Sequence, residues 1–321
     1  MRTAAVVPVH DGRGWLPGCL AALAGQGFDE LLVVDDGSTD GTAAWLAVTH
    51  PAVRVVTTAP GGPHGFAVSA QAGLDAAGDA GAVALVNADV ELAPGWRDAA
   101  LEALASGPRV GAVAGKLVRR DDPGVIDDAG DVLRRDGVCE QRGRLRRDDG
   151  RWDRPGEVWG ASGGAALYRG TALREAGGLW AGYRNYLEDV DLALALRSAG
   201  WSCAYAPGAV GRHAGGGSVA GLPAPVRYWV ARNTLLLVAR WFPVRWWPLV
   251  AYRQASWLVA AARDGVLGAH LHGLRDGLVA GARAWPGRRD RRRGARVPIA
   301  QAVPPRPWYG PAAGGHARAV E

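Results

Sequence analysis

Four short, Val-rich apolar runs near the N-terminus constrain the fold of this chain more than any other feature of its sequence. They comprise residues 3–9, 31–36, 53–57 and 82–87, and stretches with helical character, such as 15–26 and 66–78, separate them. Strands that alternate with helices predict a parallel sheet. Because the runs show no polar alternation, we expect helices on both faces of it. Ligands bind such sheets beyond the carboxyl ends of the strands, where Pro8–Asp11, Asp35–Asp40 and Asn87–Glu91 follow.

The chain divides by composition into three parts. We expect residues 1–222 to form one α/β domain, 223–285 to form two or three amphipathic helices, and 286–321 to be disordered, since this tail is rich in Pro, Gly and Arg and has no periodic apolar positions. Within the first part, 119–156 predicts loops or short strands over one edge of the sheet. Two further helices are predicted at 170–177 and 187–199.

Charge is distributed unevenly along the chain. Residues 1–225 hold 21 basic and 27 acidic side chains, whereas 226–321 hold 16 basic and 4 acidic ones. The basic part interleaves tryptophans with arginines: Trp229, Trp241, Trp246, Trp247 and Trp257 with Arg227, Arg232, Arg240, Arg245, Arg253 and Arg263. This combination favours an anionic membrane surface over nucleic acid as partner. The alternative is that these helices simply pack on the preceding domain.

Three observations bear on location. No apolar run in the C-terminal part reaches the roughly 18 residues of a membrane span. The start, MRTAAVVPVH, is too short for the core of a signal peptide. The three cysteines lie far apart, which favours a reducing compartment. We therefore expect a cytoplasmic protein that is peripheral at the inner face of the cell membrane.

Four sequence elements carry candidate chemistry. VVDDGSTDGT places Asp35 and Asp36 at a strand end, where they can hold a nucleoside by hydrogen bonds. Asn87-Ala88-Asp89 ends another strand and offers a carboxylate for a divalent cation. Glu188 and Asp189 begin a helix, a position that also suits ordinary solvated acids. His213 precedes a glycine run through which the backbone could approach a phosphate closely.

Together these elements resemble glycosyltransferase family 2, and within it the branch that includes bacterial rhamnosyltransferases. The resemblance spans about residues 3–240 and rests on five ordered motifs: VVPVHDG, VVDDGSTDGT, NADVELAPGW, ASGGAALYRGTALREAGGL, and NYLEDVDLALALRSAGW followed by His213. It implies a GT-A fold, a Rossmann-like and mostly parallel sheet of the nucleotide-diphospho-sugar transferases with C-terminal amphipathic helices added.

The resemblance also implies roles for single residues. Pro8, His10, Asp35 and Asp36 would line the nucleotide pocket, and Asn87, Gly163 and Glu188 would contact substrate. Asp89 and His213 would hold Mg²⁺ or Mn²⁺, and Asp189 would be the catalytic base. Two departures stand out: Ala88 replaces a frequent proline, and Trp180-Ala181-Gly182 replaces Phe-Asp-Glu, which puts the acceptor loop in doubt.

The expected activity is that of an inverting hexosyltransferase. A sugar, by resemblance rhamnose, would move from a UDP- or dTDP-linked donor to a hydroxyl of a lipid-linked or cell-wall glycan. Transfer from a nucleotide diphosphate needs a cation for the leaving group and a base for the acceptor hydroxyl. Direct displacement would invert the anomeric centre.

Two other interpretations remain open at this point. An NAD-dependent oxidoreductase is suggested by Gly12-Arg13-Gly14 after the first strand and by Asp35 about 20 residues on, although Pro17 replaces the third glycine. A catalytically inactive, membrane-bound relative is suggested by the altered acceptor loop. A thermal-shift comparison of NAD with UDP or dTDP separates the first from the glycosyltransferase.

Overall fold

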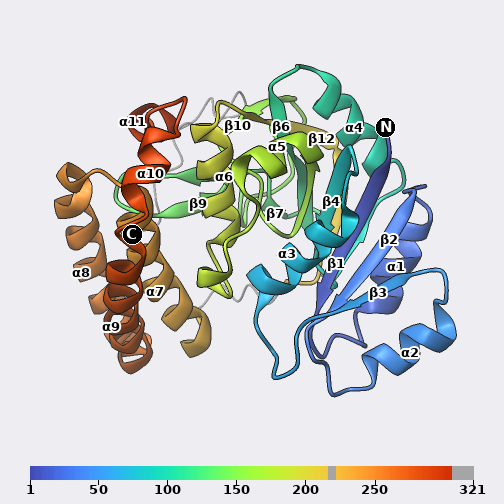
Figure 1. Ribbon diagram of the computed structural model, residues 1–321, viewed down its shortest axis with the longest axis horizontal. Helices are drawn as coiled ribbons and strands as arrows, with labels where there is room; N and C mark the ends of the chain where they lie inside the picture. The colour runs from blue at the N-terminus through green and yellow to red at the C-terminus, as the bar shows by residue number, and fades with distance from the viewer. Residues whose placement is uncertain (216–221, 306–321) are drawn as a thin grey trace.

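The computed structural model describes residues 1–215 and 222–305 and contains a large sheet with helices on both faces (Figure 1). Its parallel half consists of β3, β2, β1 and β4, in that spatial order. The bounds are Thr3–Val9 for β1, Glu30–Asp35 for β2, Arg54–Thr57 for β3 and Ala82–Val86 for β4. Each strand coincides with a predicted apolar run to within about one residue, which is the usual uncertainty of element ends.

The other half of the sheet contains antiparallel as well as parallel pairs. β11 (Ala165–Arg169) runs antiparallel to its neighbours β4 and β6 (Val110–Arg119), while β12 (Ser202–His213) is parallel to β6. Parallel neighbours need a crossover, usually a helix. The chain before β11 instead forms short strands: β7 (Ile126–Asp128), β8 (Asp131–Leu133), β9 (Cys139–Gln141) and β10 (Gly156–Val158). β5 (Val90–Leu92) pairs with the end of β12.

Helices cover both faces of the sheet, as predicted. One face packs against α1 (Leu16–Ala24), α2 (Thr42–Thr49) and α4 (Trp96–Ala105). The opposite face packs against α3 (Phe66–Ala77), α5 (Gly170–Ala176) and α6 (Glu188–Ser198). Four of these helices, α1, α3, α5 and α6, lie where the sequence placed them.

Three further helices lie at the end of the molecule opposite β3 (Figure 1). They are α7 (Ala224–Trp241), α8 (Trp247–Arg263) and α9 (Leu267–Ala284), with a short 3₁₀ turn, Val244–Trp246, between the first two. α7 shares a buried apolar cluster with α6. Within the parts of the chain that the structure describes, no helix combines the length and the apolar character needed to cross a membrane.

The burial of α7 corrects part of the argument for a lipid-facing surface. Trp241, Trp246, Arg227 and Arg240 are all buried, so these four cannot reach lipid headgroups. Arg240 can be buried because Asp191 pairs with it inside the protein. Arg227 pairs with Asp264, the exposed residue directly after α8. Only the residues of α8, α9 and the following turn that remain exposed can serve such a surface.

The tail also differs from expectation in its first part. Residues 286–305 form α10 (Arg288–Arg293) and α11 (Ile299–Ala302). Trp159 Nε1 donates to the carbonyl of Ala302 at 2.8 Å, and Arg135 Nε donates to that of Val303 at 2.9 Å. Contacts between residues far apart in sequence thus order a segment whose own composition favours disorder. Residues 306–321, which belong to the same prediction, lie outside the described residues.

Candidate active site

The motif that ends β4 and the acidic start of α6 are linked through the glycines before β11. Asn87, directly after β4, donates its backbone N–H to the carbonyl oxygen of Gly164 at 2.9 Å. The preceding Gly163 donates its N–H to Oδ2 of Asp189 at 2.8 Å. These two hydrogen bonds hold the Asn87–Asp89 motif and the carboxylate of Asp189 at one edge of the sheet.

The end of β12 brings His213 against two carboxylates. The carbonyl of Asp89 accepts a hydrogen bond from the backbone N–H of Ala214 at 3.0 Å, which fixes the strand end beside the motif. Nε2 of His213 then lies 3.3 Å from Oδ2 of Asp89, and Nδ1 lies 2.7 Å from Oδ2 of Asp127 in β7. The predicted pair Asp89 and His213 is therefore in contact, with Asp127 behind the imidazole.

Electrostatics in this cluster favour the charged forms of all three side chains. Burial acts to lower the pKa of His213, but its hydrogen bonds to Asp127 and Asp89 outweigh burial and raise that pKa to about 9. Burial likewise acts to raise the pKa values of Asp89 and Asp127, and the interaction with His213 overcomes it, so both pKa values are lowered. A histidine between two carboxylates acts here as their counter-ion.

Asp89 and His213 have the orientation of ligands for a divalent cation, but the site has too few protein ligands to hold one alone. Asp127 accepts from Nδ1 of His213, which leaves Nε2 facing Asp89, the carboxylate–histidine–metal arrangement of many metal sites. Oδ1 of Asn87 is buried without a hydrogen-bond partner among the described residues. Residues 1–215 and 222–305 nevertheless contain no group of three His, Cys, Asp or Glu side chains placed to hold a metal ion. Asp89 and His213 could hold one only if Nε2 of His213 lost its proton, which the raised pKa opposes, and a ligand supplied the remaining oxygens.

The acidic pair at the end of β2, Asp35 and Asp36, is buried and already accepts hydrogen bonds from other parts of the protein. Oδ1 of Asp35 accepts from the backbone N–H of Ser38 at 2.9 Å, which begins the turn toward α2. Oδ2 of Asp36 accepts from the backbone N–H groups of His64 and Gly65 at 2.9 and 2.7 Å, and its Oδ1 accepts from the hydroxyl of Thr58 at 2.8 Å. Both oxygens of Asp36 therefore hold the 58–65 loop.

The other two predicted nucleotide-pocket residues belong to β1 and the turn after it. Pro8 is buried in β1, paired in register with Val34 of β2. His10 lies just past the strand, and its Nδ1 is 3.1 Å from the carbonyl oxygen of Asp36. The strand ends of β1 and β2 thus bring His10 and Asp36 together, as their positions in the sequence predicted.

Asp189 has the properties of a proton acceptor. It is the second residue of α6; Oδ2 accepts from the backbone of Gly163, and Oδ1 accepts from the backbone N–H of Val190 at 2.8 Å. Burial raises its pKa, and these backbone hydrogen bonds limit the rise. A Cβ at Gly163 would lie 3.3 Å from the ring of Phe66 and 3.6 Å from Oδ2 of Asp189, so position 163 leaves little room for a side chain.

The two other acids at the start of α6 have different surroundings. Glu188 is buried, its Oε2 has no partner among the described residues, and burial together with the charge of Asp189 raises its pKa well above the usual range. Asp191 faces away from the strand ends: it accepts from Arg240 at 2.8 and 2.9 Å and from the hydroxyl of Tyr183 at 2.9 Å. Of the three acids in this helical turn, Glu188 and Asp189 thus remain candidates for the site. Asp191 instead joins α6 to α7.

Sequence reasoning missed Asp127 and Asp128. Both lie in the three-residue strand β7, within the segment whose function no pattern revealed, and the consecutive acids of IDDAGD were the only available signal. Asp128 is 3% exposed, and burial raises its pKa to about 6. No local pattern distinguishes such acids from those of a solvated loop, because only pairing with β6 buries them.

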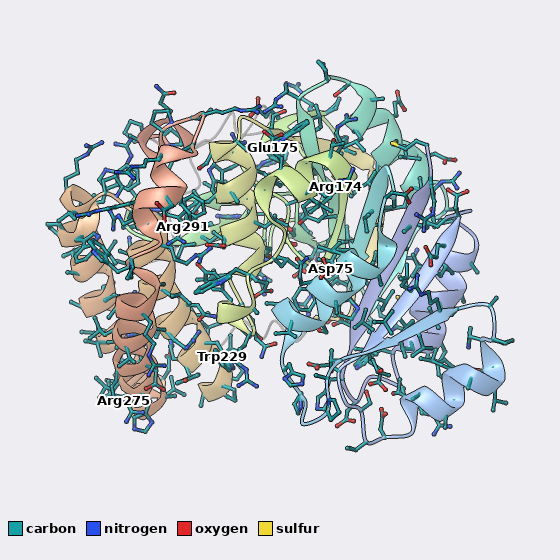
Figure 2. The ribbon with its side chains drawn as sticks, viewed as in Figure 1. Asp75, Arg174, Glu175, Trp229, Arg275 and Arg291 are labelled. Atoms are coloured by element: carbon teal, nitrogen blue, oxygen red, sulfur yellow. The ribbon has the colours of Figure 1, made fainter. Side chains whose placement is uncertain are left out.

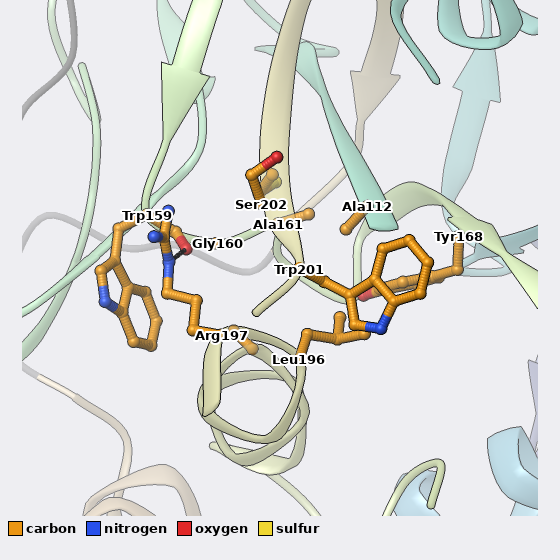
Figure 3. A pocket seen from close by; sticks show the side chains of 11 residues that line it. Ala112, Trp159, Gly160, Ala161, Tyr168, Leu196, Arg197, Trp201 and Ser202 are labelled. Atoms are coloured by element: carbon orange, nitrogen blue, oxygen red, sulfur yellow. Dashed lines mark hydrogen bonds between the residues drawn. The ribbon is translucent and has the colours of Figure 1, made fainter. Parts of the chain in front are cut away.

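A small pocket lies away from these residues. It is lined by the faces of α6, β6 and β12, including Trp159, Arg197 and Trp201 (Figure 3). Its internal volume of about 10 Å³ is at the limit for one water molecule. This pocket is too small for a nucleotide or a sugar, and it contains none of the predicted site residues.

Comparison with known proteins identifies relatives by sequence. The model of the family described as Glycosyl transferase family 2 matches residues 4–177. Two curated proteins from Mycobacterium tuberculosis, of strains CDC 1551 / Oshkosh and ATCC 25618 / H37Rv, are 36% identical over 205 residues, and both are named N-acetylglucosaminyl-diphospho-decaprenol L-rhamnosyltransferase. The match covers 56% of this chain and 64% of theirs, so the chain spans less than two thirds of these relatives.

Solved structures resemble the fold. GalNAc-T7, solved with UDP, GalNAc and Mn²⁺, has a TM-score of 0.59 at 13% identity over 76% of this chain and 48% of its own. A mannosyltransferase from Pyrobaculum calidifontis, solved with GDP-Man and Mn²⁺, has a TM-score of 0.53 at 20% identity over 89% of this chain and 87% of its own. At these identities the likeness concerns the fold alone, and it confirms the GT-A class.

Proposed function

The chain belongs to glycosyl transferase family 2, and we propose that it is a glycosyltransferase that moves rhamnose, with inversion, from a nucleotide diphosphate to a hydroxyl of a lipid-linked glycan. The sugar and the acceptor follow the names of the mycobacterial relatives, which act on an N-acetylglucosaminyl-diphospho-decaprenol. We retain dTDP as the proposed nucleotide and UDP as the alternative. The family match removes the basis for an NAD-dependent oxidoreductase.

The observation that carries this proposal is that a few hydrogen-bonded backbone residues connect the Asp89–His213 pair to the carboxylate of Asp189. Asp89 lies two residues beyond Asn87, and Gly163 lies one residue before Gly164, the partner of Asn87. Asp189 accepts from Gly163. A carboxylate–imidazole pair suited to a diphosphate-bound cation thus sits in the same strand-end region as a partly buried carboxylate suited to deprotonate a hydroxyl.

The proposed mechanism assigns one task to each group. Asp189 accepts the proton of the acceptor hydroxyl while the oxygen forms a bond to the anomeric carbon and the bond from that carbon to the nucleotide diphosphate breaks. Gly163 and Val190 orient the carboxylate through their N–H groups. A cation held by Asp89 and His213 would supply Lewis-acid stabilisation of the departing diphosphate. Attack opposite the leaving group inverts the anomeric centre without a covalent enzyme intermediate.

On the nucleotide side, the roles differ among the predicted residues. His10 and Asp35 are proposed to line the nucleoside pocket, and Pro8 to fix its floor as part of β1. Asp36 supports the proposal indirectly, because its oxygens already hold the 58–65 loop and thereby shape the pocket wall. Glu188 is proposed to contact substrate, from its position next to Asp189 at the start of α6.

A lipid-linked acceptor lies in a membrane, so we propose that the enzyme binds the inner face of the cell membrane peripherally. Exposed apolar residues of the C-terminal helices support this proposal. Trp247 and Trp285 are 38% and 40% exposed, and their ring centroids lie 5.4 Å apart. Other exposed apolar side chains on the same helices are Leu249, Tyr252, Val259, Leu267, Leu271, Leu278 and Val279. Exposed arginines accompany them: Arg245, Arg263, Arg275, Arg283, Arg289 and Arg293. Aromatic and cationic side chains together suit the headgroup boundary of an anionic bilayer.

A transfer assay tests the proposed activity. Purified protein is incubated with dTDP-rhamnose or UDP-sugars and a short-chain polyprenyl-diphospho-N-acetylglucosamine, with Mg²⁺, with Mn²⁺ or with a chelator, and products are identified by mass spectrometry. We expect cation-dependent rhamnosyl transfer. Absence of transfer from every donor, under conditions where the protein binds a nucleoside diphosphate, would favour the inactive-relative alternative.

Asp189→Asn is the matched variant for that assay. It keeps the size of the side chain and one of its two acceptor oxygens but removes the base, so kcat should fall by roughly two to four orders of magnitude. Binding of the nucleoside diphosphate, measured by calorimetry, should stay nearly unchanged because Asp189 does not belong to the nucleotide side. Comparable turnover in the variant and the parent would reject the assignment.

A further inference from the structure

The loop that leads into the proposed base has a strained backbone. It comprises residues 180–187 and ends at the N-cap of α6. Arg184, Tyr186 and Leu187 have φ values of 62°, 67° and 67°, in the left-handed region that non-glycine residues rarely adopt. Such conformations persist only where surrounding contacts over-determine them, and they concentrate at functional sites.

Asn233 of α7 supplies much of that constraint. Its side chain is fully buried, and Nδ2 lies within hydrogen-bond distance of three carbonyl oxygens of the loop: Asn185 at 2.7 Å, Tyr186 at 2.8 Å and Tyr183 at 3.1 Å. An amide group has only two hydrogens, so the three oxygens share them. One buried side chain thus holds the carbonyls of the same turn that contains the left-handed residues.

Two arginines of α7 also contact the 180–187 loop. Arg232 donates to the carbonyl of Gly182 at 3.1 Å and also to Oδ1 of Asn233, which fixes the amide so that Nδ2 faces the loop. About two helical turns beyond Asn233 on α7, the guanidinium of Arg240 lies 3.8 Å from the centre of the Trp180 ring. Both ends of the loop therefore contact α7.

The opposite side of the loop contacts the donor side of the site. Arg184 donates to the carbonyls of Pro63 and His64 at 2.9 and 3.2 Å, and its own carbonyl accepts from Ala67 at 2.7 Å. The side-chain oxygen of Asn185 accepts from the N–H of Phe66 at 2.9 Å. The loop is consequently a common wall between the segment that Asp36 holds and helix α7.

We propose that Asn233 is a positioning residue for the transfer reaction: by clamping the 180–187 loop, it sets the start of α6 and hence the carboxylate of Asp189 before any substrate binds. The inference rests on the proposed role of Asp189 as base. It makes α7 a part of the active site, although α7 lies about 40 residues beyond the base in sequence and outside the region that the family model matches.

Asn233→Asp is the sharpest variant. It is close to isosteric, yet it replaces the NH₂ donor by an oxygen that faces the same three carbonyl acceptors. Thr234→Val is the matched control: Thr234 is equally buried on the same helix, and its hydroxyl bonds only within α7, to the carbonyl of Val230 at 2.8 Å. Both variants lose a buried polar interaction of α7, but only Asn233→Asp disturbs the loop.

Two measurements test the clamp. Amide hydrogen exchange of the substrate-free protein, read by mass spectrometry in peptides covering residues 180–191, should accelerate by about ten-fold or more in Asn233→Asp and stay unchanged in Thr234→Val. In the transfer assay, kcat should fall by about ten-fold or more in Asn233→Asp while nucleoside diphosphate binding stays within about three-fold. If Asn233→Asp does not unfold cooperatively, Asn233→Ser, which keeps one donor, takes its place with the same criteria.

The outcomes separate the clamp from the base assignment. Parental exchange of residues 180–191 in the Asn233 variant, or equal acceleration in Thr234→Val, would overturn the clamp. A loosened loop with parental kcat would overturn its role in positioning Asp189. Because the exchange measurement needs no substrate, an error in the assigned reaction would appear in the transfer assays and leave the exchange result unaffected.

Discussion

At the level of single residues, the partial burial of Asp189, the proposed base, has a consequence for the pH dependence of turnover. Burial raises the pKa of its carboxyl group, and a base works only when deprotonated. We therefore expect kcat to fall with decreasing pH at values above the range of an ordinary aspartate. The measurement is kcat under saturating substrates from about pH 4 to pH 9, with nucleoside diphosphate binding followed over the same range as control. A kcat that stays constant down to the pKa range of a solvent-exposed aspartate would contradict the assignment.

The contact between Asp89 and His213 leads to a second prediction at this scale. Asp89→Ala should weaken cation-dependent binding of the nucleoside diphosphate much more than binding of the free nucleoside, since a cation joins this carboxylate only to the diphosphate. Asp127→Asn should lower cation affinity by about 10- to 100-fold, a smaller loss than in Asp89→Ala. Asp127 acts on the cation only through the imidazole of His213. Calorimetric titration of both ligands with Mn²⁺ measures these differences. Equal losses for nucleoside and nucleoside diphosphate would exclude a cation at Asp89.

At the level of elements, one buried ion pair joins the C-terminal helices to the catalytic domain. Asp191 of α6 is 3% exposed and Arg240 of α7 is 7% exposed, and the two form two hydrogen bonds. Trp241 also donates to this carboxylate, at 2.5 Å. Acids at a helix start are ordinary partners of the helix dipole, but Asp191 is also the attachment point of α7.

Arg240→Met should therefore destabilise the whole protein. The change leaves the charge of Asp191 buried without its counter-ion, which typically costs about 3–5 kcal/mol of unfolding free energy. Arg275→Met is the matched control, because Arg275 is an exposed residue of α9 that pairs with the neighbouring Asp276 (Figure 2). Chemical denaturation measures both variants. If Arg240→Met were as stable as Arg275→Met, the pair would not anchor α7.

At the level of the whole molecule, the apolar and basic residues that remain exposed lie on α8, α9 and the turn after them, at the end opposite β3 (Figure 1). Truncation after residue 222 is not a clean test of membrane binding. Leu236, Leu237 and Phe242, which such a truncation removes, are fully buried in the cluster that α7 shares with α6, so the truncated protein would expose part of its own core. Surface substitutions avoid this problem.

Trp247→Ser combined with Trp285→Ser is the variant that tests the surface. We expect the parent to sediment with vesicles that contain anionic lipid, with binding that falls as salt rises, because each arginine near such a surface contributes about 1 kcal/mol. The double variant should bind markedly less, since its aromatic pair is lost. Val48→Ser is the control, because Val48 is 82% exposed on α2 at the other end of the molecule. Equal sedimentation of parent and double variant would refute a membrane role for α8 and α9.

Much of the fold was predictable because local patterns encode local structure. The apolar runs coincide with β1 to β4, and the acidic start and the glycine after residue 199 mark α6. The positions of His10, Asp35, Asn87 and Asp89 at one edge follow from a single rule, that parallel strands end together. The antiparallel direction of β11 could not be read in the same way, since it depends on the absence of a crossover helix before it.

The sequence by itself determined the strands and helices of the first half, the strand-end residues and the acids that begin α6, because propensity, periodicity and capping act over a few residues. Only the tertiary structure decided which acids meet which distant partners. Asp127 meets His213 across 86 positions, Asn233 meets the 180–187 loop across about 50, and Arg240 neutralises Asp191 across 49. Such contacts depend on which surfaces the folded elements bury against one another, and no short pattern of residues carries that information.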